Sequence, residues 1–124
     1  MYLTTEIISQ LIEWTKEEYP NEAAGYLFKD NSIFKKIVTE DHSGAHFFDN
    51  NLSQLLEWIE KWGSPSAIFH SHPGAATPSG VDYHYMQTTI PFFGCVWIIM
   101  SRDLKLRAWS LSNRRFIELG ITVL

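Results

Sequence analysis

Two histidines separated by a single residue, His70 and His72, are the clearest sign of chemistry in this sequence. On an extended backbone, residues i and i+2 point to the same face, so both imidazoles can bind one metal ion. A loop of proline, glycine and small residues follows over 73–78, and Ser79-x-x-Asp82 then has the form of a helix start. Such a loop can bring Asp82 back toward the histidines. Two imidazoles and one carboxylate are three protein ligands, the number that a catalytic zinc site uses while it keeps a fourth position for water.

A hydrolytic metal site also needs a base, and Glu22 is available for that role. It lies between the first expected helix and the first expected strand, in the kind of connection where catalytic groups are commonly presented. The small residues Ala23, Ala24 and Gly25 follow it and leave room for a close approach of the backbone. Composition alone does not place Glu22 beside the histidines.

Hydrophobic periodicity and turn residues predict three helices interspersed with short strands. The helices are expected to begin after Thr5, after an N-cap at Asn51 and near Ser79, and to end before Pro20, at Gly63 and at about Gln87. The strands are expected over Ala24–Phe28, Ile33–Val38, His46–Phe48, Ser66–Phe69, Cys95–Met100, Lys105–Ser110 and Phe116–Val123. The first two strands should form a hairpin. This order indicates an α/β or α+β fold, with helices packed on a sheet.

The bulk composition is that of an ordinary globular domain. A length of 124 residues fits one domain over 1–124, and 45% hydrophobic with 19% charged residues argues against disorder. The net charge of −4 does not indicate a protein that binds nucleic acid. The adjacent Arg114 and Arg115 are interpreted as a solvated strand end. The single cysteine, Cys95, excludes an internal disulfide and lies in an apolar run that favours a buried, inert thiol.

No stretch of the sequence resembles a signal peptide or a membrane span. The first residues lack a basic start followed by an apolar segment. No apolar run approaches the roughly 20 residues that cross a bilayer. We therefore expect a cytoplasmic protein with no membrane partner.

Glu22, His70-Ser71-His72-Pro73 and Ser79-Gly80-Val81-Asp82 together resemble the signature of the JAMM, or MPN+, zinc metalloprotease family. That signature is a glutamate, a distant His-Ser/Thr-His-Pro and then Ser-x-x-Asp, and the resemblance covers nearly the whole chain. It implies a mixed, curved β-sheet packed with about three helices. Members of the family hydrolyse isopeptide or peptide bonds, often at the C-terminus of ubiquitin or a ubiquitin-like protein.

The resemblance implies a role for each matched residue. His70, His72 and Asp82 match the zinc ligands, with one zinc per chain and water as the fourth ligand. Glu22 matches the general base, and Ser79 matches the serine that stabilises the tetrahedral oxyanion. The chain departs from the pattern at one point: six residues separate His72 from Ser79, where the family usually has seven. The departure concerns the geometry of the loop and hardly touches the ligand set.

Other classes of metal site fit the sequence less well. A cupin would carry a glutamate shortly after the second histidine, where this chain has Ala76 and Thr77. An amidohydrolase barrel typically needs about 200 or more residues. A RadC-type protein has a similar motif, but this chain shows no extra helical segment for binding DNA.

Several residues that could attract a functional interpretation have plainer ones. Ser71 could either pack between the histidines or contribute to the site, and the sequence leaves both open. His84 should point away from Asp82, and His42 and His46 are interpreted as surface residues or contacts at the edge of a substrate. The tryptophans Trp14, Trp58 and Trp62 are interpreted as core and rim packing.

The sequence therefore predicts a zinc metallopeptidase whose partner is a protein with a flexible C-terminal tail. A ubiquitin-like protein, a sulfur-carrier protein and a phage tail component all remain possible substrates. The alternative is a catalytically silent MPN scaffold or binding module. Such scaffolds typically lack the metal ligands, and this chain has all of them together with Glu22. The sequence does not indicate an oligomeric state.

Overall fold

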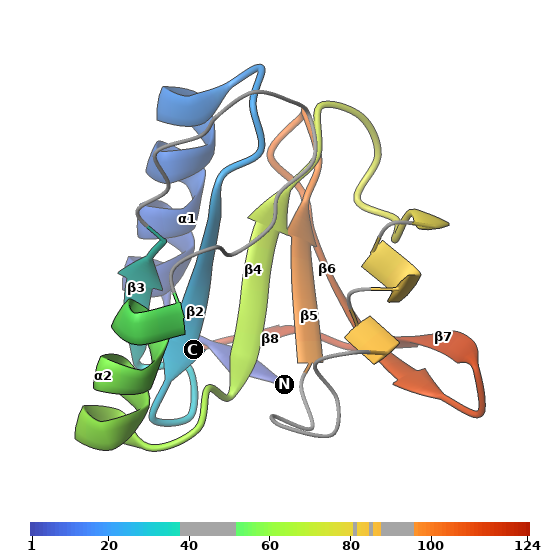
Figure 1. Cartoon of the computed structure of the whole chain (residues 1–124). Helices are drawn as coiled ribbons and strands as arrows, with labels where there is room; N and C mark the ends of the chain where they lie inside the picture. Colours follow the sequence, from blue (N-terminus) through green and yellow to red (C-terminus); the bar gives the residue numbers. More distant parts are fainter. Residues whose placement is uncertain (38–51, 81, 85, 88–95) are drawn as a thin grey trace.

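The computed structural model describes residues 1–37, 52–80, 82–84, 86–87 and 96–124 (Figure 1). The helices are α1 (Thr5–Glu18) and α2 (Leu52–Trp62), and residues 80, 82–84 and 86–87 are also helical. The strands are β1 (Tyr2–Leu3), β2 (Ala24–Phe28), β3 (Ile33–Lys36), β4 (Ala67–Ser71), β5 (Val96–Met100), β6 (Leu106–Ser112), β7 (Arg115–Leu119) and β8 (Thr122–Val123). Three helical segments beside a mixed sheet confirm the predicted α+β class.

The main sheet has six strands in the order β3-β2-β4-β5-β6-β7. Strands β4 and β5 run parallel, whereas all other neighbours in this sheet are antiparallel. A parallel pair needs a long crossover connection, and here that connection contains the loop 73–78 and the helical residues after it. Ala24 of β2 lies opposite His70, and Met100 of β5 lies opposite Ser71. The strand that carries the candidate ligands is therefore held on both sides.

Hydrophobic residues fill both faces of this sheet. On one face, Ile7 of α1 packs in a cluster with Phe69 of β4. On the other face, Leu55 of α2 packs in a cluster with Ile68 of β4. Because side chains alternate along a strand, His70 emerges on the same face as Ile68.

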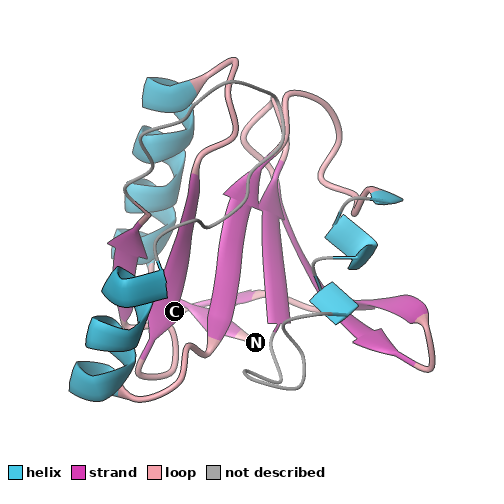
Figure 2. Ribbon diagram, viewed as in Figure 1, coloured by secondary structure: helices cyan, strands magenta, loops and turns pink. Residues whose placement is uncertain are grey.

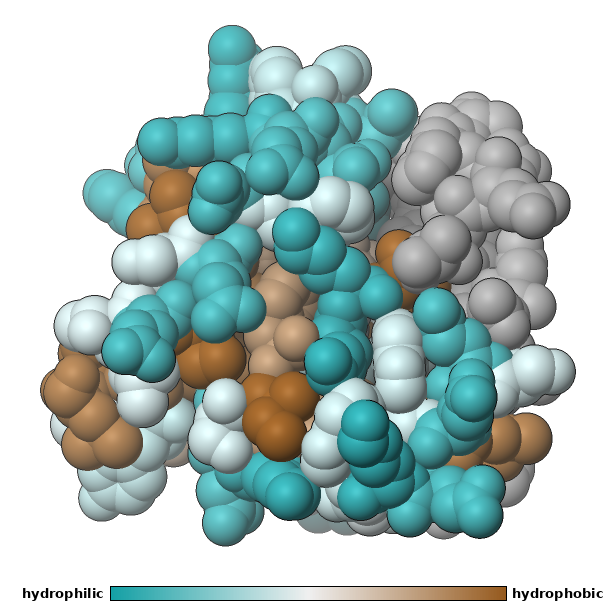
Figure 3. All heavy atoms as spheres, turned by 90° about the vertical axis from the view of Figure 1, so that its left-hand side faces the viewer, coloured by the Kyte–Doolittle hydropathy of each residue, from teal (hydrophilic) through white to brown (hydrophobic). Residues whose placement is uncertain are grey.

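Figure 2 shows α1 and α2 beside β3, at one end of the main sheet, and the short helical residues after Ser79 near β7, at its other end. The side of the molecule turned to the viewer in Figure 3 carries mostly hydrophilic side chains, with hydrophobic ones in small separate groups. Among the described residues, no helix has the length and apolar character needed to cross a membrane.

Most of the predicted elements are confirmed. Helix α1 begins at Thr5 behind an N-cap at Thr4, whose side chain accepts the Ile7 N–H at 3.2 Å. Strand β2 has the predicted bounds and forms the predicted hairpin with β3. Helix α2 ends before Gly63, which adopts the left-handed conformation (φ 83°) that favours glycine after a helix.

Four strand predictions were wrong in extent. Strand β3 ends at Lys36, and β6 covers Leu106–Ser112 instead of Lys105–Ser110. Strand β4 continues through His70 to Ser71 instead of ending at Phe69, because hydrogen bonding to both neighbouring strands continues past the apolar run. The strand predicted over Phe116–Val123 is two strands, β7 and β8. Strand β8 leaves the main sheet to pair in parallel with β1, a two-residue strand that periodicity cannot reveal.

Some predictions fall on residues outside the described ranges. These are the strand over His46–Phe48, the N-cap at Asn51, the surface or substrate-edge role of His42 and His46, and the buried thiol of Cys95. They stay predictions.

Candidate metal centre

The end of β4 presents both histidines to one point, as the i, i+2 spacing predicted. The Nε2 atoms of His70 and His72 lie 2.9 Å apart. His70 is almost completely buried, with the ring of Trp97 edge-on against it at 5.1 Å between centroids. His72 is partly exposed. One imidazole is thus fixed inside the fold, while the other faces the surface beside it.

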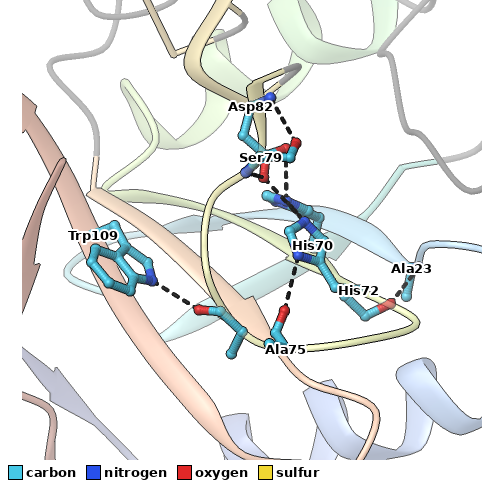
Figure 4. A network of polar contacts seen from close by, with 9 residues as sticks. Ala23, His70, His72, Ala75, Ser79, Asp82 and Trp109 are labelled. Carbon is cyan, nitrogen blue, oxygen red and sulfur yellow. Dashed lines mark hydrogen bonds and ion pairs between the residues drawn. The ribbon is translucent and has the colours of Figure 1, made fainter. Parts of the chain in front are cut away.

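Asp82 completes the group, although nine residues lie between it and His72 in the sequence. Its Oδ1 lies 3.1 Å from Nε2 of His70, and its Oδ2 lies 3.1 Å from Nε2 of His72 (Figure 4). A tetrahedral zinc ion with ligand bonds of about 2.0–2.1 Å places its ligand atoms about 3.3 Å apart. In this protein the two Nε2 atoms lie 2.9 Å apart, and each lies 3.1 Å from a different oxygen of the Asp82 carboxylate, so these separations are close to that value. We refer to the three side chains as the donor triangle.

A reciprocal capping interaction holds Asp82 in place. The Ser79 N–H donates to Oδ2 of Asp82 at 2.8 Å, and the Asp82 N–H donates to Oγ of Ser79 at 3.1 Å. The helix begins at residue 80, so Ser-x-x-Asp is the helix start that the sequence predicted. The Ser79 hydroxyl uses only an oxygen lone pair in this interaction. Its own hydrogen remains able to serve a second partner, because a hydroxyl is both donor and acceptor.

The electrostatics of the three groups suit a cation. Burial lowers the pKa of His70, which keeps this imidazole neutral. Although burial of Asp82 favours its neutral form, hydrogen bonds from His70 and His72 hold the pKa of its carboxyl well below the usual range. Burial opposes the charging of His72, but the hydrogen bond and charge of Asp82 raise the pKa of this imidazole. Metal binding requires deprotonated ligands, so a proton and a metal ion compete for His72.

Glu22 is a second carboxylate at the same place. One of its oxygens and one ring nitrogen each of His70 and His72 lie within 4.8 Å of one another. Asp82 acts on the pKa of His72 through a hydrogen bond as well as through its charge, whereas Glu22 acts through its charge. Asp82 is therefore the carboxylate in hydrogen-bonding contact with both imidazoles, and Glu22 is the second carboxylate beside them.

Glu22, His72 and Ser79 share an open cleft of about 380 Å³. Its remaining walls are formed by Pro73, Gly74, Ala75, Thr77 and Pro78 of the loop. Glu22, predicted to act as base, and Ser79, predicted to donate to an oxyanion, thus line the same cleft as the partly exposed His72. A substrate in this cleft would meet all three.

Three consecutive carbonyl groups anchor the loop from outside. The Gly74 carbonyl accepts the Arg102 N–H at 2.9 Å, and the Ala76 carbonyl accepts Nε1–H of Trp109 at 3.0 Å. Between them, the Ala75 carbonyl lies 3.1 Å from Nδ1 of His72 (Figure 4). Because a carbonyl can only accept, Nδ1 carries the hydrogen in this bond, and Nε2 of the neutral ring keeps its lone pair for a metal.

The sequence interpretation missed one contributor to this site and left the role of another open. Trp109 was not singled out, since nothing in the sequence links β6 to the loop. Ser71, whose role was left open, accepts the Ala23 N–H through its Oγ at 2.8 Å. His84 is exposed, with its ring against Tyr83, as expected for a residue without a ligand role. The predicted packing of Trp14, Trp58 and Trp62 is also confirmed, because each lies partly buried against a hydrophobic cluster.

Solved structures with this fold are known from several prokaryotes. A Desulfitobacterium hafniense protein determined in solution has a TM-score of 0.74 and 21% identity, over 99% of this chain and 92% of that one. A structure described as a JAMM metalloprotease-like zinc site in the proteasome and signalosome has a TM-score of 0.64 and 17% identity, over 100% and 97%. A JAB1/MPN domain protein from Archaeoglobus fulgidus has a TM-score of 0.63 and 18% identity, over 100% and 99%. At these identities, the similarity shows a shared fold.

The comparison of sequences gives the family. No match was found among curated proteins. The family model of prokaryotic homologues of the JAB domain matches residues 4–112, a range that includes every residue of the site described above. The resemblance to JAMM proteins that the motifs indicated is thereby confirmed. This chain belongs to the prokaryotic homologues of the JAB domain.

Proposed function

We propose that this protein is a zinc metallopeptidase that hydrolyses a peptide or isopeptide bond. The observation that carries the proposal is the donor triangle of His70, His72 and Asp82. Its nitrogen–nitrogen distance of 2.9 Å and its two nitrogen–oxygen distances of 3.1 Å are near the edge length of a tetrahedral zinc site. Glu22 beside the triangle adds a carboxylate that can act as a general base, which a catalytically silent metal site would not need. The retained ligands and base favour an enzyme over a catalytically silent scaffold.

Zinc, when bound, supplies a Lewis acid that polarises a carbonyl and acidifies water. Glu22 accepts a proton from the attacking water as the new carbon–oxygen bond forms. The Ser79 hydroxyl donates a hydrogen bond to the oxyanion that develops on the carbonyl oxygen. Glu22 then delivers its proton to the nitrogen of the leaving amine as the carbon–nitrogen bond breaks. The second proton of the water also passes to the amine, directly or through solvent, so the products are a carboxylate and a protonated amine.

The preferred substrate, in this proposal, has a flexible C-terminal tail that ends in small residues. The cleft supports this because its loop wall consists of proline, glycine, alanine and threonine, and because the loop is tied back at three carbonyls. A fixed wall close to the ligands favours a thin, extended chain, such as a tail that ends in Gly-Gly. A ubiquitin-like or sulfur-carrier protein has such a tail, and a phage tail component is an alternative substrate for the same chemistry.

Elemental analysis tests the metal. Protein purified without chelators should contain one zinc per chain, and His70→Ala, His72→Ala and Asp82→Ala should each lose or greatly weaken it. His84→Ala is the matched control, because this histidine is exposed and outside the triangle. If the wild-type protein neither contains zinc nor takes it up on reconstitution, the proposal is wrong.

Cleavage of tail fusions tests the reaction and the substrate class. A folded ubiquitin-like protein is joined through its Gly-Gly tail to a reporter, and a second fusion carries bulky residues at the same two positions. We expect cleavage of the first, little cleavage of the second and none by the zinc-free variants. Equal cleavage of both fusions would contradict the tail preference, and cleavage by the zinc-free variants would contradict the metal mechanism.

A further inference from the structure

Ser71 lies between the two histidines and is almost completely buried, with 3% of its surface exposed. Its backbone N–H donates to the Ala23 carbonyl at 2.9 Å. Its side-chain Oγ accepts the Ala23 N–H at 2.8 Å (Figure 4). Ala23 is also buried, at 1% exposed. Two hydrogen bonds therefore connect the residue between the ligands to the residue directly after Glu22.

The use of a side chain here has a structural reason. In an antiparallel ladder, a hydrogen-bonded pair exchanges two bonds between backbone groups. At the Ala23–Ser71 pair, a hydroxyl takes the place of the second backbone acceptor. Directly after this pair, the chain turns toward β5, where the His72 N–H donates to the Met100 carbonyl at 2.8 Å. The Ser71 hydroxyl thus keeps a hydrogen bond to the segment before β2, at the point where the backbone after β4 bonds to β5.

The hydroxyl is in no position to act as a ligand or as a substrate contact. Neighbouring residues of a strand point to opposite faces, so the Ser71 side chain leaves the sheet away from His70. Its burial also separates it from the cleft, whose walls do not include it. The Ser71 hydroxyl can therefore affect the site only through the segment that carries Glu22.

We propose that Ser71 is a positioning residue that fixes Glu22 against the histidine pair. The inference rests on the proposed function, in which Glu22 is the base. Ser71 holds both backbone groups of Ala23, and Glu22 is the next residue along the chain. Ser71, between His70 and His72, thereby sets the position of the Glu22 carboxylate, which transfers the proton in the proposed reaction.

Three variants separate this role from simple packing. Ser71→Ala removes the acceptor, and Ser71→Thr keeps the hydroxyl. Ser66→Ala is the matched control, because Oγ of Ser66 likewise accepts a backbone N–H, that of Asn31 at 3.0 Å, just before the opposite end of β4. If Ser71→Ala does not fold, Ser71→Cys replaces it, since its sulfur has nearly the same size and is a weak acceptor.

The first measurement does not depend on activity. Hydrogen exchange of the Ala23 amide should speed up at least tenfold in Ser71→Ala, stay slow in Ser71→Thr and stay slow in Ser66→Ala. Zinc content should be unchanged in all three. An unchanged Ala23 exchange rate in Ser71→Ala, or loss of zinc from it, overturns the proposal.

The second measurement asks whether the effect passes through Glu22. Misplacing a catalytic group by about 1 Å can cost on the order of 100-fold in rate, so kcat of Ser71→Ala should fall about 10- to 100-fold with little change in KM. Ser71→Thr should recover most of kcat, and Ser66→Ala should keep it. In a Glu22→Gln background, Ser71→Ala should lower the residual rate no further. A full additional loss in that background means that Ser71 does not act through Glu22.

These outcomes also distinguish this inference from the proposed function. A protein that binds zinc but cleaves nothing contradicts the proposed function, while the exchange of the Ala23 amide still decides whether Ser71 fixes this segment. An active enzyme whose kcat is unchanged in Ser71→Ala leaves the proposed function intact and overturns the role of Ser71.

Discussion

Replacing Glu22 by glutamine removes proton transfer while it preserves the shape of the side chain. In the structure, Glu22 lies near the histidine pair but acts on His72 through its charge, whereas Asp82 forms hydrogen bonds to both imidazoles. The three groups of the donor triangle are untouched by the change. We therefore expect Glu22→Gln to keep its fold, its zinc and its affinity for substrate, and to lose turnover.

The expected loss can be bounded from the role that Glu22 plays. General acid–base groups contribute about 10²- to 10⁴-fold to rate, which corresponds to about 2.7–5.4 kcal/mol of activation free energy. Because Glu22 would both accept and deliver the proton, kcat should fall by at least about 100-fold. KM should change little, since neither the loop wall nor the ligands are altered. A protein that binds but does not turn over would also retain its partner in a pull-down.

Cleavage kinetics and zinc analysis on the same preparations provide the assay. Glu17→Gln on α1 is the matched control, since this exposed residue undergoes the same change of charge away from the histidines. Turnover of Glu22→Gln at close to the wild-type rate would refute a catalytic role for this carboxylate. Loss of zinc would refute the reasoning differently, because Glu22 would then be a ligand or the support of one.

Three further outcomes are expected. Gly25→Ala should destabilise the fold by about 1–3 kcal/mol in chemical denaturation, because its new Cβ would lie against the Phe34 ring and 2.5 Å from the Lys35 carbonyl oxygen. Trp109→Phe should cost about 1 kcal/mol and raise KM severalfold, since the Ala76 carbonyl loses its donor and the loop wall loosens. Chelation should lower the melting temperature, and zinc rather than magnesium should restore it, because a ligand of the native state stabilises that state.

The elements that a local pattern can define were predictable. Strand β2 lies between a helix and a turn of polar residues, and α2 has a regular apolar stripe that ends at Gly63. The end of β4 was not predictable from apolar periodicity, because His70 and Ser71 interrupt the hydrophobic pattern while remaining in the sheet. Strands β1 and β8 are two residues each and exist only through their mutual pairing, which no local pattern contains.

The proximity of His70, His72 and Asp82 was predictable for a different reason. The spacing of His70 and His72 is a property of the extended backbone, and the capping of Ser79 with Asp82 is a property of a helix start, so both depend on local geometry. The contributions of Ser71 and Trp109 depend on contacts with Ala23 and Ala76, at sequence separations of 48 and 33 residues. Such contacts become visible only when the sheet brings these segments together.

The short loop between His72 and Ser79 shows how the long-range contacts complete the local ones. A loop with one residue fewer than the family usually has must still deliver Asp82 to the histidines. It does so with its path fixed by three carbonyls, and with Asp82 held by its own helix start. The side chains of His72 and Asp82 are therefore held by contacts within the protein itself, which would reduce the ordering that metal binding has to accomplish. The same loop forms a wall of the cleft. Under the proposed function, one segment would therefore both position Asp82 and limit the shape of the substrate.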